Sequence, residues 1–373
     1  MPVDQLGIGM IGAGSMAVHH LEAWGQNPGT KVVAITNRTE DRAASLAREF
    51  GISHVCSTAD ELVHRADVDA VSISLPHNLH HPMATLAIEA GKHVFCEKPL
   101  ATSLFDARQM LARAQRAGVK TGIQFGHRVL PGLGKLRTLF QEGAIGRAEY
   151  LECSWCFDWA RDPAFPLVWR FRRDAAGAGA LADLGVYAID VARWLLGEFN
   201  SVVGHLETFV AYRPLFSGGE HFDQVVRRVE EGTLDLSHDV GEVENEDECT
   251  WLATFACGAH GFFRSSRVRS EQRLLLSGSQ GALLWRLDGD RLWERSGGQH
   301  TFVEVELARA APRATFIDPF VRDVGRDTEL GPTFLDGVRA QEVMDAVLIS
   351  AVERRWTAVP VADGRAFAAR DAR

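Results

Sequence analysis

The first 125 residues alternate short apolar runs with segments whose apolar positions recur every three or four residues. The runs predict buried strands, and the periodic segments predict helices. Strands are expected at 6–11, 31–36, 69–75, 93–96 and 121–125, and helices at 16–26, 40–50, 82–90 and 103–117. Because strands that alternate with helices are typical of βαβ units, this half is predicted to be a doubly wound α/β domain with a parallel sheet.

The pattern changes around residues 126–131. A helical segment, 133–143, leads into the apolar run 148–157, and most later runs resemble strands separated by turn residues: 201–211, 249–255, 261–268, 273–278, 282–287 and 301–305. A long helix is expected at 337–353 and a last strand at 356–361. The sequence therefore predicts two domains, residues 1–125 and 126–373, the second being α+β with a mostly antiparallel sheet.

A polar stretch between residues 212 and 246 interrupts the second half. It runs into an acidic segment, 241–248, which is expected to be a solvated loop. An insertion of this length could also shape a pocket or an interface.

Composition and charge exclude several classes of protein. A length of 373 residues suits two domains, and the net charge of −9 argues against a general nucleic-acid binder, which needs a basic face. No apolar run approaches the roughly 20 residues that span a bilayer, so no membrane partner is expected. The N-terminus lacks the basic and apolar regions of a signal peptide, and we expect a cytoplasmic protein.

The cysteines and one group of histidines are the candidate metal ligands of the chain. The six cysteines are too sparse for a disulfide framework. Cys153 and Cys156 lie three apart in an expected strand, where their side chains point to opposite faces, and no second pair accompanies them. His77, His80 and His81 have no carboxylate or thiol beside them. No metal site is predicted.

The segment 6–17 combines an apolar strand with the turn Gly12-Ala13-Gly14-Ser15-Met16-Ala17, which fits G-x-G-x-x-[G/A] and opens a helix. In this context Gly12 allows a tight turn, and Gly14 lets a pyrophosphate approach the backbone. The free N–H groups at the helix start favour an anion. The segment predicts a nicotinamide-dinucleotide site that includes Gly12, Gly14, Ser15 and Met16; the alternative is a glycine-rich loop that binds nothing.

The residues after the second strand bear on the choice of cofactor. An NAD site usually has an acidic residue here to bind the ribose 2′-hydroxyl. Asn37 removes that charge, and Arg38 could pair with a 2′-phosphate, which favours NADP(H) while NAD(H) remains possible. Alternatively, Arg38 is a solvated arginine or stacks on the adenine.

Ligands bind beyond the carboxyl ends of strands in such sheets, so residues there are further candidates. Glu97 and Lys98 are two opposite charges at the end of an apolar strand, and Lys98 is expected to project toward the nicotinamide; the alternative is a surface ion pair. Residues assigned to cofactor binding by their place at other strand ends are Leu75, Pro76, His77, His80 and Gln124.

A second constellation lies in the other half. Asp183 and Tyr187 are four residues apart at the start of a helical pattern, so they share one face, with Asp183 at the N-cap position. We expect both to face Lys98 across a cleft between the domains. The alternatives are a plain N-cap for Asp183 and a core aromatic for Tyr187. Further substrate-side candidates are Arg128, Trp169 and Arg170.

These motifs resemble the Gfo/Idh/MocA oxidoreductases. The resemblance is carried by the glycine turn, Pro76 with His80, the segment 91–99 ending in Glu-Lys-Pro, Trp169-Arg170, and 183–190, an Asp-x-Gly-x-(His/Tyr)-x-x-Asp pattern, and it covers nearly the whole chain. It implies a Rossmann domain followed by a domain with an open, largely antiparallel sheet, through whose open face relatives often pair as dimers or tetramers.

The resemblance also implies an activity. It assigns catalysis to Lys98, Asp183 and Tyr187, and substrate binding to these residues with their neighbours. The region 169–181 is similar to the branch with inositol and levoglucosan dehydrogenases, so a sugar or cyclic polyol is the expected substrate. Tyr187 departs from the histidine usual in that branch. Some relatives cleave glycosides with transient oxidation and no net redox change, and a non-catalytic dinucleotide sensor is a third possibility.

In the expected mechanism, a secondary alcohol passes hydride to the nicotinamide and its hydroxyl proton to Tyr187. Free tyrosine has a pKa near 10. The Lys98 ammonium is expected to favour the phenolate and to stabilise the developing alkoxide, while Asp183 orients the sugar hydroxyl or Lys98.

Overall fold

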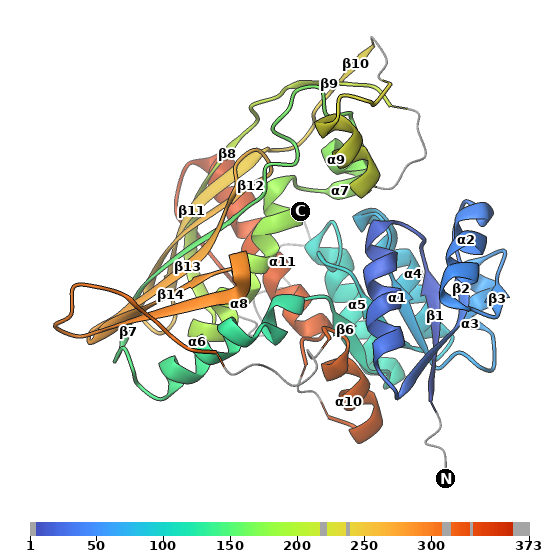
Figure 1. Ribbon diagram of the computed structural model, residues 1–373, viewed down its shortest axis with the longest axis horizontal. Helices are drawn as coiled ribbons and strands as arrows, with labels where there is room; N and C mark the ends of the chain where they lie inside the picture. Colours follow the sequence, from blue (N-terminus) through green and yellow to red (C-terminus); the bar gives the residue numbers. More distant parts are fainter. Residues whose placement is uncertain (1–4, 217–221, 236–238, 308–314, 329–330, 361–373) are drawn as a thin grey trace.

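The computed structural model describes residues 5–216, 222–235, 239–307, 315–328 and 331–360. Two sheets organise these residues, one in each half of the chain (Figure 1). Helices fill the space between the two sheets, so both halves contribute to the region where they meet.

The first sheet is parallel, with strand order β3-β2-β1-β4-β5-β6. Its strands are β1 Leu6–Ile11, β2 Thr30–Thr36, β3 His54–Val55, β4 Ala70–Ile73, β5 His93–Cys96 and β6 Thr121–Ile123. Its helices are α1 Ser15–Gln26, α2 Glu40–Phe50, α3 Ala59–Val63, α4 His80–Glu89 and α5 Leu104–Ala117. The order reverses at β1 and β4, which confirms the doubly wound fold; the sequence missed only the short β3 and α3.

The second sheet has strand order β16-β15-β14-β13-β7-β12-β11-β8-β17. It comprises β7 Ala148–Cys156, β8 Phe199–Glu207, β11 Glu248–Phe255, β12 His260–Ser266, β13 Glu271–Gly278, β14 Gly281–Arg286, β15 Arg291–Ser296, β16 Val303–Glu304 and β17 Thr357–Ala358. Among the described strands of this second sheet, only the β7–β12 pair is parallel, so the prediction of a mostly antiparallel sheet is confirmed.

Helices α6 Pro131–Gln141, α8 Val186–Leu196 and α11 Phe334–Glu353 pack on one face of this sheet. Alternate residues of the strands are therefore buried, such as Leu151, Cys153 and Trp155 of β7. Their neighbours on the strand point to the other face, on which Tyr150 is exposed.

The C-terminal part of the chain returns to the first sheet. Helix α10, Asp318–Arg326, places Phe320 against Phe95 and Trp24, at ring-centroid distances of 5.6 and 6.1 Å. The Ile123 N–H donates to Pro332 O, which occupies the edge of β6. The two sequence-predicted domains thus share a core, because part of 126–373 covers the first sheet.

The insertion 212–246 is ordered in its described parts. It forms β9 Tyr212–Pro214 and β10 Val240–Glu242, which pair with each other, and helix α9 Phe222–Glu230. The prediction that the acidic run 241–248 is solvated is wrong for its second part, since Asn245, Glu246, Asp247 and Glu248 are all buried, whereas Glu242 is exposed. Asp247 pairs with buried Arg267 (2.8 Å), and Glu246 caps a helix.

One helical stretch, Arg173–Leu196, is long and apolar enough to cross a membrane, contrary to the expectation that no segment approaches this length. Of its most apolar window, 72% is buried inside the protein, as in the core helix of a globular domain. This stretch includes the short helix α7 Arg173–Ala176, a π-helical turn Leu181–Gly185 and α8.

Candidate active site

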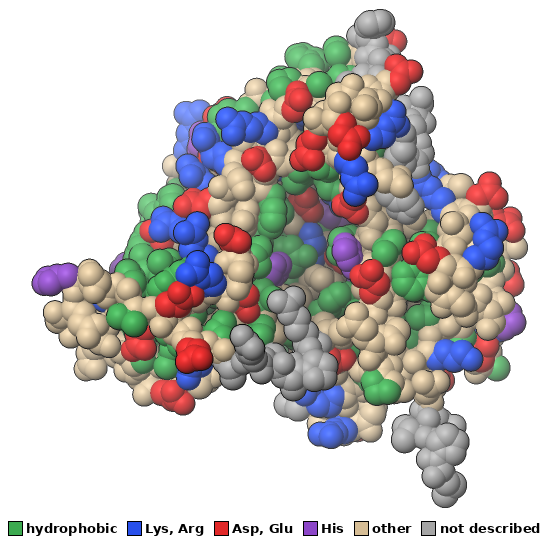
Figure 2. Space-filling model, viewed as in Figure 1, with side chains coloured by type: hydrophobic (Ala, Val, Ile, Leu, Met, Phe, Trp, Pro, Cys, Tyr) green, Lys and Arg blue, Asp and Glu red, His purple; other side chains and the backbone are tan. Residues whose placement is uncertain are grey.

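A hollow lies where the two halves meet, and histidine and charged side chains are visible at its floor (Figure 2). The carboxyl ends of β1, β4, β5 and β6 carry the glycine turn, residues 75–80, Lys98 and Gln124. From the second half, the π-helical turn brings Asp183 and the first turn of α8 brings Tyr187. Residues from distant parts of the chain therefore meet here.

The glycine turn is shaped for a ligand. Gly12 has φ +111°, and a Cβ there would lie 2.1 Å from Ser74 O, so only glycine fits. A Cβ on Gly14 would have no atom within 4 Å, which leaves the approach to the start of α1 open. The buried Ser15 Oγ has no partner among the described residues, and no side chain caps α1. These unpaired donors fit a diphosphate.

The candidate ribose residues lie beside this turn. The Asn37 side chain is engaged locally, because Oδ1 accepts from Ala13 N–H (3.2 Å) and Nδ2 donates to Thr39 O (3.0 Å). Arg38 is exposed. Leu75 and Pro76 are half-buried, and Leu75 packs beside Gly12.

Lys98 and Asp183 form the centre of the site. Lys98 Nζ donates to the backbone oxygen of Asp183 (2.7 Å) and to its Oδ1 (3.1 Å). Burial would raise the pKa of Asp183, but the charges of Lys98 and Arg170 more than offset it and hold this pKa well below its ordinary value. Asp183 is therefore an ionised carboxylate with two cationic neighbours.

The alternative that Asp183 is a plain N-cap is wrong. It lies inside the π-helical turn, which runs directly into α8, and its side chain faces Lys98 instead of the helix start. Such turns are frequent at functional sites. The start of this helix is capped from another segment, where Glu246 Oε1 accepts the N–H groups of Gly179 and Leu181 (2.9 Å each).

Tyr187 lies against the same lysine but not as expected. Lys98 Nζ is 4.7 Å from the centre of the Tyr187 ring, while the Tyr187 hydroxyl donates to Gln124 Oε1 (3.1 Å). Burial, with the charges of Glu97, Asp183 and Asp190, raises the pKa of Tyr187 well above 10. The expectation that Lys98 favours the phenolate is therefore wrong, because the ammonium faces the ring and the desolvated phenol is stabilised.

Trp169 and Arg170 form the wall beside Asp183. Arg170 Nε lies 3.7 Å from Asp183 Oδ2, and its guanidinium carbon is 4.6 Å from the centre of the Trp169 ring. The His77 ring meets Trp169 edge-on at 4.8 Å, and its Nδ1 lies 3.0 Å from Ala176 O. His77 thus links the cofactor half to the substrate wall.

The side chains of three residues that were predicted to bind ligands are already hydrogen-bonded to other groups of the protein. Glu97 is buried, with Oε1 bound to His20 Nε2 (3.0 Å) and Oε2 to the Lys98 N–H (3.1 Å). His80 is buried, with its ring nitrogens 2.8 Å from Pro99 O and 3.0 Å from Leu75 O. Arg128 is bound by Asp190 and Asp336. They hold the loops around the site rather than presenting free groups to it.

Sequence reasoning missed a buried hydrogen-bonded chain beneath Lys98. Trp24 Nε1 donates to Ser72 Oγ (3.0 Å), Ser72 Oγ lies 2.8 Å from His20 Nδ1, and His20 Nε2 reaches Glu97. Because an indole can only donate and a carboxylate can only accept, the chain runs in one direction and ends at the Glu97 carboxylate, which also accepts the backbone N–H of Lys98. The available signal was His20, a polar residue on the apolar face of α1.

His127 was also missed. Its ring packs against Tyr187 (4.4 Å) and Trp155 (4.5 Å), and burial with the Lys98 charge lowers the pKa of His127 to about 3. A neutral imidazole therefore stands beside the phenol. No group of three or more histidine, cysteine or acidic side chains that could hold a metal occurs in the described ranges.

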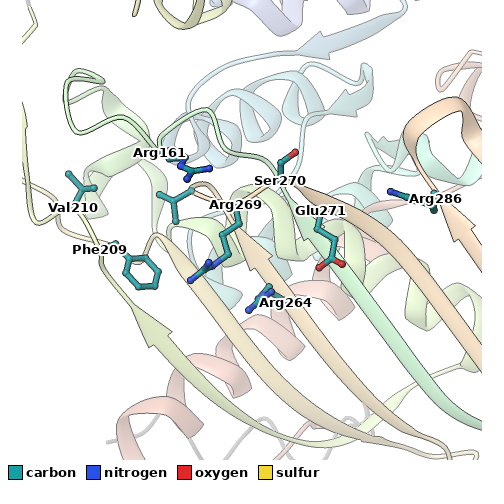
Figure 3. A pocket seen from close by; sticks show the side chains of 9 residues that line it. Arg161, Phe209, Val210, Arg264, Arg269, Ser270, Glu271 and Arg286 are labelled. Carbon is teal, nitrogen blue, oxygen red and sulfur yellow. The ribbon is translucent and has the colours of Figure 1, made fainter. Parts of the chain in front are cut away.

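A separate pocket of about 650 Å³ lies beside strands β12, β13 and β14 of the second sheet (Figure 3). Its lining includes Arg161, Arg264, Arg269 and Arg286, and it shares no residue with the group around Lys98. Glu248 accepts from Arg269 (2.7 Å) within this cluster.

Comparisons with known proteins agree with this geometry. A model of an oxidoreductase family with an NAD-binding Rossmann fold matches residues 6–125, and a model of the GFO/IDH/MocA C-terminal domain matches residues 133–284. Levoglucosan dehydrogenase of Pseudarthrobacter phenanthrenivorans is 28% identical, covering 96% of this chain and 99% of that protein. Myo-inositol 2-dehydrogenase of Thermotoga maritima is 26% identical, covering 74% of each.

Solved structures show the same similarity. Levoglucosan dehydrogenase in complex with NADH and L-sorbose superimposes with a TM-score of 0.86 at 27% identity, over 95% of this chain and 99% of that one.

Proposed function

The chain belongs to the Gfo/Idh/MocA family of oxidoreductases, and from this premise we propose that it transfers a hydride between a nicotinamide cofactor and a secondary alcohol or ketone of a sugar or cyclic polyol. The observation that carries the proposal is the contact of Lys98 with both Asp183 and Tyr187, at the carboxyl edge of the first sheet. The substrate class is supported by the relatives named levoglucosan and myo-inositol dehydrogenase.

The residues at this edge fit a dinucleotide. The glycine turn and the unpaired Ser15 hydroxyl would hold the diphosphate, and Leu75 and Pro76 would line the path toward Lys98. A bound nicotinamide supplies the hydride donor or acceptor. The protein has to orient the substrate carbon and move one proton.

Tyr187 is the proposed proton carrier. Its high pKa keeps the phenol protonated, so in the direction of reduction it can donate to a carbonyl oxygen. The Lys98 ammonium beside the ring stabilises negative charge on that oxygen, and Asp183 fixes the ammonium and accepts from a substrate hydroxyl. In oxidation the substrate hydroxyl proton passes to the phenolate form of Tyr187, and the raised pKa disfavours formation of that phenolate, so the residue is better suited to the direction of reduction.

The choice between NADP(H) and NAD(H) is part of the proposal. Arg38 is exposed beside the glycine turn, and Asn37 brings no negative charge, which supports NADP(H). The levoglucosan dehydrogenase structure contains NADH. Replacing Arg38 with alanine should weaken NADPH binding by about 10- to 150-fold and leave NADH binding within about twofold, since a charge-assisted bond contributes roughly 1.5–3 kcal/mol.

A two-stage experiment tests the function. NADPH and NADH are first titrated by fluorescence, and levoglucosan, myo-inositol and other sugars are then screened at the nicotinamide absorbance. Turnover with a cofactor-dependent absorbance change supports the dehydrogenase. Released sugar with constant NAD(P)H would instead indicate glycoside cleavage, and binding without turnover on any sugar would indicate a sensor.

A homodimer or homotetramer through the second sheet is also proposed. On the open face, residues that lie side by side on neighbouring strands are Val203, Leu252, Phe262, Glu152, Leu275, Leu284 and Trp293. All of these except Glu152 are apolar, and Leu252 is 47% exposed. Leu252→Glu should shift the molar mass measured by light scattering toward the monomer; an unchanged mass above that of the monomer would place the interface elsewhere. A cytoplasmic location rests on the sequence argument alone.

A further inference from the structure

The insertion places an aromatic ring beside the substrate wall. Phe222 is the first residue of α9, and its ring packs against Trp159 (5.0 Å between centroids) and Phe165 (6.0 Å). Val225, one turn further on, is 2% exposed in the same apolar cluster. The helix is therefore anchored to the second half through its buried side, with Phe222 at the end nearest the site.

Phe222 contacts Arg170. The guanidinium carbon of Arg170 is 4.2 Å from the centre of the Phe222 ring and 4.6 Å from that of Trp169. We call these three residues the Arg170 clamp. Two aromatic rings restrict where a guanidinium can lie, because its charge is attracted to their faces and its rotation is limited by them.

The clamp leaves the donors of Arg170 available. Its backbone oxygen accepts from Asn245 Nδ2 (3.0 Å) and Arg267 (3.1 Å), so the chain is fixed. For its side chain, the described residues provide only the 3.7 Å contact with Asp183 in addition to the rings. A guanidinium has five N–H donors, and most of these can bind a substrate.

We propose that Phe222 is a specificity-determining residue of the sugar site: it holds Arg170 so that the guanidinium binds a substrate hydroxyl next to the one held by Asp183. The inference rests on the proposed function. It assigns helix α9 of the insertion a role in substrate choice, which neither Lys98 nor Tyr187 could provide because both act on the oxygen of the reacting group.

The test compares three variants. Phe222→Ala removes the ring, Phe222→Leu keeps apolar volume without a π face, and Val225→Ala is the matched control, since it weakens the packing of α9 without touching Arg170. Kinetics use whichever of levoglucosan and myo-inositol the wild type oxidises, together with monodeoxy analogues of that sugar. Labelling of Arg170 by phenylglyoxal, followed by peptide mass spectrometry, reports on the clamp without any turnover.

We expect kcat/KM for the full sugar to fall about 5- to 30-fold in both Phe222 variants, mostly through KM, as a lost cation–π contact implies. One deoxy analogue, which lacks the hydroxyl bound by Arg170, should lose less than about twofold in the same variants. Val225→Ala should leave the ratio of sugar to analogue unchanged. Arg170 should be labelled faster in Phe222→Ala than in the wild type and in Val225→Ala.

Two results would overturn the inference. Equal losses for the sugar and every analogue would show that Phe222 only supports the fold, as would the same change of ratio in Val225→Ala. If the wild type oxidises none of the sugars, the proposed function fails, and labelling alone decides: an unchanged rate in Phe222→Ala means that no clamp exists.

Discussion

Lys98 follows a strand of the first half and contacts residues of both halves. Its ammonium binds Asp183 twice and faces the Tyr187 ring, while its backbone N–H is bound by Glu97. Glu97 in turn is bound by His20, so one buried chain fixes the strand end that carries the lysine. The position of a single charge thus depends on residues from both sheets.

Tyr187→Phe tests the proton carrier. Removing the hydroxyl should lower kcat by about a hundredfold or more, the usual contribution of general acid–base groups, with unchanged cofactor affinity. Tyr150→Phe, on the open sheet face, is the control and should keep full activity. Turnover of Tyr187→Phe within a few-fold of the wild type would remove Tyr187 from the mechanism.

The same residue predicts a pH dependence of stability. Unfolded tyrosine ionises near pH 10, whereas the raised pKa keeps buried Tyr187 protonated. Its contribution to stability is therefore present below pH 10 and is lost as the pH rises toward the folded pKa. Thermal unfolding should show the melting temperature of the wild type falling more steeply above pH 10 than that of Tyr187→Phe.

Asp183 predicts the opposite dependence of stability on pH. Its pKa is lowered in the folded protein, so its ionic contribution is present above about pH 4, the pKa of an unfolded aspartate, and declines as the pH falls below it. The difference in unfolding free energy between the wild type and Asp183→Asn, measured in urea, should be smaller at pH 3 than at pH 7. A constant difference would mean that the ion pair with Lys98 contributes nothing.

At the scale of elements, the helix that carries Asp183 and Tyr187 is capped from outside itself. Glu246, from the acidic run, accepts two N–H groups at its start, and the Gly179 position admits this segment because a Cβ there would lie 2.0 Å from Glu246 O. The run therefore positions the site, although its composition suggests a solvated loop.

Glu246→Ala should lower the free energy of unfolding by about 2–3 kcal/mol, because it leaves two buried donors unpaired. Glu246→Gln keeps an acceptor oxygen and should cost less. Burial raises the pKa of Glu246, so the wild type loses stability relative to Glu246→Gln as the pH rises through that pKa. Urea unfolding of both variants between pH 4 and 7 measures this; a Gln variant as unstable as the Ala variant would contradict it.

At the scale of the molecule, α10 joins the two halves. Phe320 is 3% exposed among Phe95, Trp24 and Ile8 on the first sheet. Phe320→Ala should cost about 3–5 kcal/mol of apparent stability, the usual loss for a buried phenylalanine. Unfolding followed by tryptophan fluorescence measures it, and the exposed Arg322→Ala should change stability by less than about 0.5 kcal/mol. A similar loss of stability in Phe320→Ala and Arg322→Ala would show that the packing of Phe320 does not hold α10 on the first sheet.

Periodicity and strand-end chemistry predicted much of this protein. The glycine turn, the doubly wound parallel sheet and the place of Lys98 at a strand end follow local rules, because backbone geometry and burial act within a few residues. The contact of Lys98 with Asp183 joins residues 85 positions apart, so its prediction depended on the motifs shared with the family and not on periodicity. Short elements such as β3 and α3 were missed because two to five residues carry little periodic signal.

The sequence by itself determined the two sheets, the dinucleotide turn and the residue types of the site. Only the tertiary structure decided which side chains are free to bind a ligand: Glu97, His80 and Arg128 are hydrogen-bonded to protein atoms. It also decided that the Tyr187 phenol is desolvated and not activated by Lys98. It also decided that the end of an acidic run is buried and that an inserted helix reaches the substrate wall. The physical reason is that burial and charge depend on neighbours distant in the chain, which local patterns do not encode.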